Sequence, residues 1–227
     1  FRYSRIFLRK DGNAINVPIS IITDCDIEPD KKDGKIDQRE DETAAAIVAI
    51  QHKYNVGCIS AFVAPKWTFE YSVAFSCLRD MLYKSILQAK KIENSDQYAL
   101  TIAKIEEIEK ILAQEKEKWS TQELCITAHH IYHDTMLNKG NPESKTKATS
   151  KAIVAQCLAS NLRWAITDTA SAGEGGVPLS KDQMFDLDLY QAHIDEGKRV
   201  ALANEIVKDT YLSYLVLAIK HAAGIEG

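Results

Sequence analysis

The sequence predicts an α/β fold: a mostly parallel sheet flanked by helices, with a long helical insertion and a helical C-terminal tail. Two apolar runs, at residues 17–23 and 56–64, are typical of strands buried on both faces of such a sheet. A helical pattern over residues 42–54 separates them. After the second run, apolar residues recur at helical spacing, which indicates helices.

The elements before the first buried strand are predicted from short patterns. Residues 1–10 alternate apolar and basic side chains, which predicts a strand, and Asp11-Gly12-Asn13 predicts a turn. The chain begins at Phe1 without a methionine, so we expect it to be a fragment of a longer polypeptide. After the first buried strand, residues 30–41 are predicted to form a charged loop.

The second half of the chain predicts mainly helices. The apolar stripe over residues 95–118 indicates a long amphipathic helix packed in a hairpin. The other helices are expected over residues 68–92, 120–138, 147–166 and within 181–223, with a loop at 171–180.

This pattern predicts three segments. Residues 1–92 are expected to form the α/β core and residues 93–140 a helical insertion. Residues 141–227 are expected to complete the core and add the C-terminal helices.

Composition and charge exclude several classes of protein. The chain has 227 residues, of which 45% are apolar, so it can bury a sizeable core and is not disordered throughout. No apolar run is long enough to cross a bilayer. The net charge of −4 argues against a generally basic nucleic-acid binder, but not against a metal-dependent nuclease. The five cysteines contain no C-x-x-C pair, so we expect reduced thiols in a cytoplasmic protein.

An acidic cluster follows the first buried strand directly. Asp24, Asp26 and Glu28 alternate along this segment. Ligands of parallel sheets bind beyond the carboxyl ends of the strands. Carboxylates two residues apart can point the same way if the chain stays extended, and Mg²⁺ takes oxygen ligands of this kind. The alternative is a solvated acidic loop without a ligand.

A further acid, Glu70, follows the second buried strand. Thr68 is expected to cap a helix there, with Glu70 in its first turn. Glu70 is therefore either a functional acid at the sheet edge or a residue that stabilises the helix start.

These segments together carry a family resemblance. The stretch YSRIFLRKDGNAINVPISIITDCDIEP, followed after a helix and a strand by APKWTFEYSVA, resembles the Toprim domain of OLD-family (overcoming-lysogenization-defect) ATP-dependent nucleases. In that family a strand ends in D-x-D, a later segment has T/S-x-E, and a lysine follows in the pattern K-x-x-x-A-x-x-L-A. Residues 151–159 (KAIVAQCLA) fit the lysine pattern. The resemblance covers about residues 1–75 and 145–163, and the tail YLSYLVLAIKHA resembles the family more weakly.

The resemblance implies a Toprim-like fold and a Mg²⁺- or Mn²⁺-dependent DNA endonuclease that acts in bacterial defence against phage or plasmids. Asp24 and Asp26 would bind one metal ion, and Glu70, helped by Thr68, would serve a second. Two such ions clamp the attacking and leaving oxygens of a phosphodiester displacement.

The resemblance also implies a catalytic lysine. Lys151 would stabilise the negative charge that develops near the scissile phosphate, with Glu70 as the other catalytic residue. Lys198, in a Gly-Lys-Arg segment, is the alternative to Lys151. Lys145 and Lys147 could form a DNA-binding patch beside Lys151, or a solvated region before a helix.

The sequence departs from the family pattern in two places. Toprim domains have a glutamate upstream of D-x-D, and residues 1–23 contain none, so we expect that glutamate in a preceding segment. The chain also lacks G-x-x-x-x-G-K-[ST], so ATP would act only through an ATPase part outside this chain. The expected partners are DNA, that ATPase part and a second copy of the chain, but no membrane.

Two other functions stay open. The D-x-D-x-E pattern at Asp24 is also similar to that of type IA topoisomerases, so another Toprim activity, of a topoisomerase or a primase, is one alternative. The other is a non-catalytic assembly module of a larger protein.

A histidine group lies in the segment ITAHHIYHDTML. His129 and His133 are four residues apart, so on a helix they share one face and could bind zinc. No H-E-x-x-H motif is present, and a solvated or partly buried helix face is the simpler interpretation.

Overall fold

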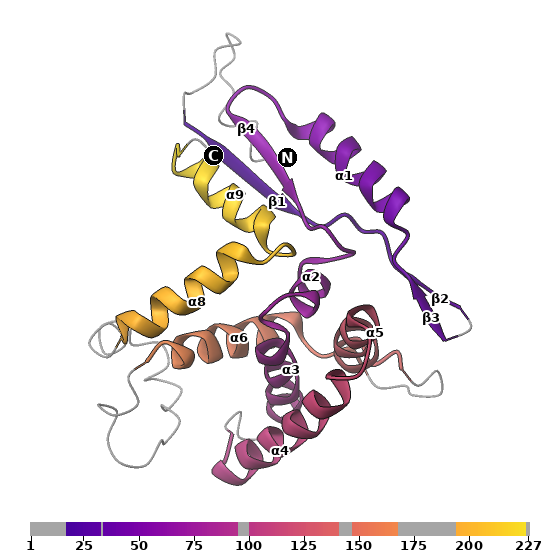
Figure 1. Ribbon diagram of the computed structural model, residues 1–227, viewed down its shortest axis with the longest axis vertical. Helices are drawn as coiled ribbons and strands as arrows, with labels where there is room; N and C mark the ends of the chain where they lie inside the picture. Colours follow the sequence, from indigo (N-terminus) through magenta and orange to yellow (C-terminus); the bar gives the residue numbers. More distant parts are fainter. Residues whose placement is uncertain (1–16, 33, 95–99, 141–146, 168–193, 226–227) are drawn as a thin grey trace. The chain divides into compact units, whose positions relative to one another are not determined.

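The computed structural model describes residues 17–32, 34–94, 100–140, 147–167 and 194–225, drawn in colour in Figure 1. The predicted strand at 1–10, the turn after it, the loop at 171–180 and Lys145 lie outside these residues. The chain forms two compact units. The first comprises Phe1–Ser76 and Val207–Gly227, and the second comprises Cys77–Ile206. The division into segments 1–92, 93–140 and 141–227 that the sequence suggested stays a prediction.

The first unit is built on two parallel strands, β1 (Ile19–Thr23) and β4 (Ile59–Val63). They pair in register from Ile19 opposite Ile59 to Thr23 opposite Val63. The helix α1 (Glu40–Tyr54) lies between them in the chain. The α/β class, the parallel pairing and these three elements confirm the sequence prediction.

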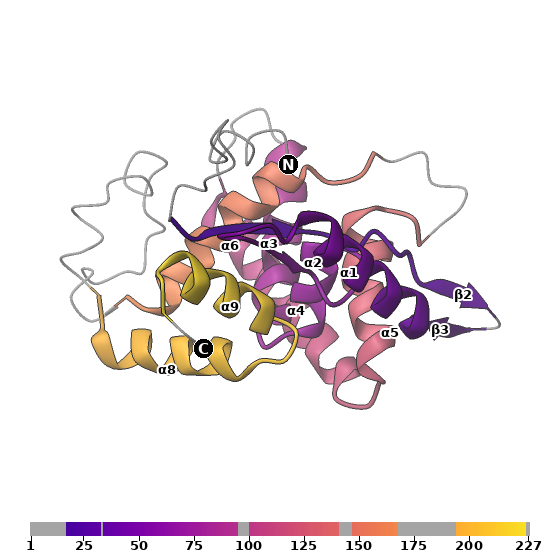
Figure 2. The same cartoon turned by 90° about the horizontal axis from the view of Figure 1, so that it is seen from above.

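Helices cover the strand pair. The helix α1 packs against β4, and α9 (Ser213–Ala222) packs against both strands. Figure 1 shows these helices on opposite sides of the pair, and Figure 2 shows α9 running along it. Alternate residues of β4 are buried, namely Ile59, Ala61 and Val63.

Burial on both faces was expected for both strands. In β4 the residues between the buried ones are half-buried, and for β1 the expectation is wrong. Its Ile22 side chain is 51% exposed, and none of its five residues is buried. Within the described part of the chain β1 pairs only with β4, so one edge of β1 has no neighbouring strand there.

The charged segment after β1 forms a hairpin, although the sequence predicted a loop. Strands β2 (Asp30–Lys32) and β3 (Lys35–Asp37) pair antiparallel. Gly34 has φ +77°, which a glycine adopts readily in a tight turn. The strand residues are nearly all charged and exposed, so they lack the apolar alternation that identifies strands in a sequence.

The single helix expected over residues 68–92 is two helices, α2 (Phe69–Phe75) and α3 (Arg79–Glu93). Ser76 ends α2 in an extended conformation, with ψ 179°. Its hydroxyl donates a 2.8 Å hydrogen bond to the Val73 carbonyl. Serine side chains that bond to nearby backbone compete with the helix, and this explains the break.

The second unit is a set of packed helices. The helix α3 contacts both α4 (Ile102–Trp119) and α6 (Lys151–Ala165). Ion pairs Lys91–Glu107 and Lys116–Asp80 join α3 to α4 at 2.7 and 2.6 Å. Low residue numbers of one helix pair with high numbers of the other, so the two helices run antiparallel, and the expected hairpin is confirmed.

The predicted helix over residues 120–138 begins as α5 (Leu124–His129) and continues as a π-helical segment, η2 (His130–Met136). The C-terminal tail contains α8 (Glu196–Lys208) and α9. No helix within the described ranges is both long and apolar enough to span a membrane.

Candidate metal site at the strand ends

The two acidic segments leave the sheet at the same edge, because β1 and β4 are parallel. Backbone contacts continue past the strands: the Ala64 amide donates to the Thr23 carbonyl at 2.8 Å. The Asp26 amide then donates to the Trp67 carbonyl at 3.0 Å. The D-x-D and T-x-E segments therefore run side by side beyond the strands.

Asp24 and Thr68 both cap the start of α2. A carboxylate oxygen of Asp24 accepts a 2.7 Å hydrogen bond from the Phe69 amide. The Thr68 hydroxyl accepts one from the Tyr71 amide at 3.2 Å. These contacts satisfy two of the amides that a helix start leaves without intrahelical partners. The cap predicted at Thr68 is confirmed, whereas the cap by Asp24 joins residues too distant in sequence for a local pattern to show.

Glu70 and Asp24 share this edge with Tyr214 of α9. Glu70 is half-buried in the first turn of α2. Burial raises the pKa of the Tyr214 hydroxyl, and the negative charges of Asp24 and Glu70 raise it further. The buried Tyr214 hydroxyl has no hydrogen-bond partner among the described residues. This edge thus combines two carboxylates with the Tyr214 hydroxyl, a hydrogen-bond donor without a partner among the described residues. The sequence analysis did not identify Tyr214.

Asp26 does not have the extended backbone conformation that was expected for the D-x-D segment. Its φ is +58°, in the left-handed region, which aspartate tolerates better than most residues. The side chain of Asp26 is exposed, whereas that of Asp24 is half-buried. The condition under which the two carboxylates would point the same way is therefore not met.

The donor chemistry at this edge suits a hard divalent cation, since carboxylate oxygens are the ligands that Mg²⁺ prefers. Asp24 and Glu70 supply them, and the unpartnered Tyr214 hydroxyl could donate to an oxygen there. The carboxylates of Asp24, Asp26 and Glu70 do not gather within 4.8 Å of one another. Within the described ranges, a three-residue group that close occurs at His129, His133 and Asp134.

The candidate lysines belong to the second unit. Lys151 is exposed at the first position of α6, after the cap Ser150, and its ammonium lies 5.8 Å from the Tyr132 ring centre. Lys147 is also exposed. The ammonium of Lys198 donates to the Thr167 carbonyl at 3.0 Å.

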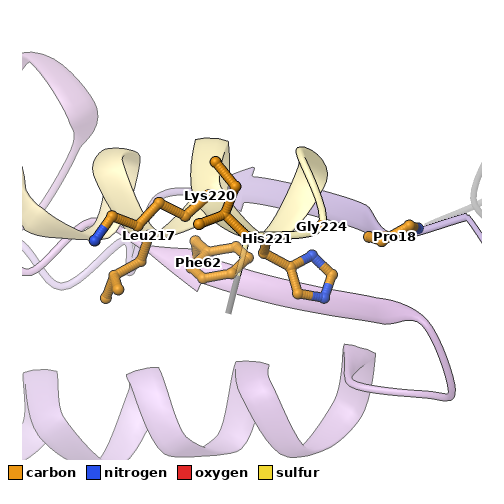
Figure 3. A pocket seen from close by; sticks show the side chains of 7 residues that line it. Pro18, Phe62, Leu217, Lys220, His221 and Gly224 are labelled. Atoms are coloured by element: carbon orange, nitrogen blue, oxygen red, sulfur yellow. The ribbon is translucent and has the colours of Figure 1, made fainter. Parts of the chain in front are cut away.

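A shallow apolar groove of about 340 Å³ lies on the first unit, over β4 and α9 (Figure 3). Phe62, Leu217 and His221 are among its lining residues. The His221 ring lies between two serines, with Nδ1 3.2 Å from the Ser20 hydroxyl and Nε2 3.1 Å from the Ser60 hydroxyl. These serines are register partners on β1 and β4, which the sequence did not reveal.

Comparison with known proteins gives no assignment of this chain to a family. No protein-family model, curated protein or solved structure matches it.

Proposed function

We propose that this chain is a Toprim-like nuclease domain that hydrolyses DNA phosphodiesters with Mg²⁺ or Mn²⁺. One observation carries the proposal: the D-x-D and T-x-E segments leave adjacent parallel strands at one edge, where Asp24 bonds to the amide that precedes Glu70. The motif resemblance supports an OLD-like ATPase-nuclease as the whole protein, with a role in defence against phage or plasmids. ATP would then be bound by its ATPase part.

Each residue has a separate task in this proposal. Asp24 and Glu70 would hold the cation, and Asp26 would join them if its segment turned toward the edge. When bound, the cation would supply charge stabilisation and activate a water molecule. The Phe69 amide fixes the orientation of Asp24, and the Tyr214 hydroxyl can donate a hydrogen bond to a bound oxygen. Lys151 would neutralise charge on the phosphate, while Lys145 and Lys147 would contact the DNA backbone.

A non-catalytic assembly module is the second candidate. One observation favours it, namely that the three acids do not converge on one point. Asp26 turns away from an extended course, and the three acids do not gather closely. In this case Asp24 would serve only as a helix cap. The topoisomerase-like alternative differs in requiring Glu28, whose side chain is exposed.

The test is plasmid cleavage with Mg²⁺ and Mn²⁺ by the complete protein that contains this chain. We expect Asp24→Asn to reduce cleavage at least ~100-fold, a loss typical of removing one charge-stabilising group. Asparagine can still accept the Phe69 hydrogen bond, so the helix cap is kept. Asp41→Asn is the matched control, because Asp41 is an exposed aspartate on α1.

Each outcome decides between the candidates. Cleavage that survives Asp24→Asn would overturn the nuclease assignment of this edge, as would no cleavage by the wild type. Loss of cleavage in Glu28→Gln as well would favour the topoisomerase-like alternative.

A further inference from the structure

We propose that His129, His133 and Asp134 form a binding site for a zinc-like transition metal ion. The site lies in the second unit and is independent of the proposed nuclease site. One ligand atom from each residue lies within 4.8 Å of the others. The chemistry differs from that of the strand-end acids, because imidazole nitrogen suits zinc and related metals better than Mg²⁺.

The histidines are partly withdrawn from solvent. His129 ends α5 and is 3% exposed, while the His133 side chain is 19% exposed. Their rings stack with centres 4.3 Å apart and an angle of 18° between the planes. The two imidazole rings are therefore close together and largely shielded from solvent.

Asp134 already shares a hydrogen with His133. The Nδ1 atom of His133 is 2.9 Å from a carboxylate oxygen of Asp134. Ligands of a tetrahedral zinc ion, with bonds near 2.1 Å, lie about 3.4 Å apart. A cation could therefore replace the shared hydrogen after a small separation of the two groups, with the hydrogen moving to Nε2. The stacked His129 ring must also tilt, so that its lone pair meets the same point.

The backbone at the site is unusual in two ways. The helix changes from α to π directly after His129, and π-helical turns occur frequently at functional sites. Gly140 lies against Asp134: a Cβ at this position would stand 2.8 Å from the Asp134 Cβ. Glycine allows this approach because it has no side chain. Any larger residue at position 140 would displace Asp134.

A third histidine, His130, lies near the Asp134 carboxylate. The Nδ1 atom of His130 lies 3.8 Å from the second carboxylate oxygen of Asp134. The Nε2 atom of His130 lies 3.6 Å from a Glu115 carboxylate oxygen. Both distances exceed hydrogen-bond length, and His130 Nε2 has no hydrogen-bond partner among the described residues, so His130 is a polar neighbour of the site and not a fixed contact of Asp134. Three protein ligands leave a fourth position for water or a substrate group.

The test is titration of the metal-free, tag-free chain with Zn²⁺ by calorimetry. Absorption of bound Co²⁺ serves as a second readout, because its spectrum reports the coordination geometry. We expect His133→Gln to weaken Zn²⁺ binding more than the ~10–100-fold loss caused by removing a residue that only orients a ligand. His52→Gln is the matched control, because His52 is exposed on α1.

A second variant keeps all three ligands. Gly140→Ala should displace Asp134 and weaken Zn²⁺ binding about 10-fold, the smaller loss expected when a ligand is only misplaced. Circular dichroism of each variant verifies that the helices are intact.

The proposal is overturned if the wild type binds no Zn²⁺, if His133→Gln binds it as tightly as the wild type, or if His52→Gln loses as much affinity. Asp24→Asn should bind Zn²⁺ normally, so failure here is distinguishable from failure of the nuclease proposal.

Discussion

The two units differ in how well their apolar residues are covered. In the first unit, β1 pairs with a single strand among the described residues, and its Ile22 is 51% exposed. In the second unit, α3 is covered by α4 and α6, and its Ile86 is 0% exposed. The same residue type therefore contributes very differently to stability in the two places.

The candidate sites follow this difference. The acids at the strand ends carry the motif resemblance, but the three of them do not form a close group, and Asp26 is exposed. The histidine group matches no motif, yet its ligand atoms are close and His129 is buried. Motif and geometry thus point to different parts of the molecule, and each can be tested separately.

The largest effect is expected from the core of the second unit. Ile86→Ala should lower the free energy of unfolding by about 2–5 kcal/mol, because it leaves a cavity between packed helices. Ile22→Ala, at an exposed position of β1, should change it by about 0.5 kcal/mol or less. Urea unfolding followed by circular dichroism measures both, and similar losses for the two variants would contradict the difference in packing.

The next effect concerns whether the second unit contributes to the proposed cleavage. Lys151→Ala should reduce plasmid cleavage about 100-fold, if its ammonium stabilises charge on the phosphate. Lys198→Ala should have little effect, because the Lys198 ammonium bonds to the Thr167 carbonyl. Loss of cleavage in Lys198→Ala alone would transfer the role to Lys198. Loss in neither variant would confine the chemistry to the first unit.

Local sequence patterns correctly predicted the elements that depend mainly on their own residues and not on distant contacts. The strands β1 and β4, the helix α1 and the cap at Thr68 follow from apolar runs, helical spacing and a capping residue. The break at Ser76 and the hairpin around Gly34 were missed. The break depends on one serine side chain within an apolar helical pattern, and the hairpin is made of charged residues.

For the site at the strand ends, the sequence predicted which residues follow the strands but not the contacts that they make there. Parallel pairing brings Asp24 and Glu70 to one edge, and this was expected from the positions of the strands. The turn at Asp26 depends on its backbone contact with Trp67, which is distant in sequence. Tyr214 reaches the two acids from α9, near the other end of the chain. The closeness of His129 and His133 follows from helical spacing, but the approach of Gly140 to Asp134 does not.

The smallest effect separates the two tasks of Asp24. Asp24→Ala removes both the charge and the hydrogen bond to the Phe69 amide, so it should cost about 1 kcal/mol of stability, as loss of a helix cap does. Asp24→Asn keeps an acceptor for that amide and should cost less. Thermal unfolding compares these variants with Thr68→Ala, which removes the other cap of α2.

If Asp24→Ala and Asp24→Asn are equally unstable, the hydrogen bond to α2 is not what matters, and the charge of Asp24 itself stabilises the edge. If both are as stable as the wild type while cleavage is lost, Asp24 contributes to the chemistry alone. The expected order, with alanine less stable than asparagine, would show that the hydrogen bond from the Phe69 amide to Asp24 stabilises the start of α2, and that this contact holds Asp24 next to the segment that carries Glu70.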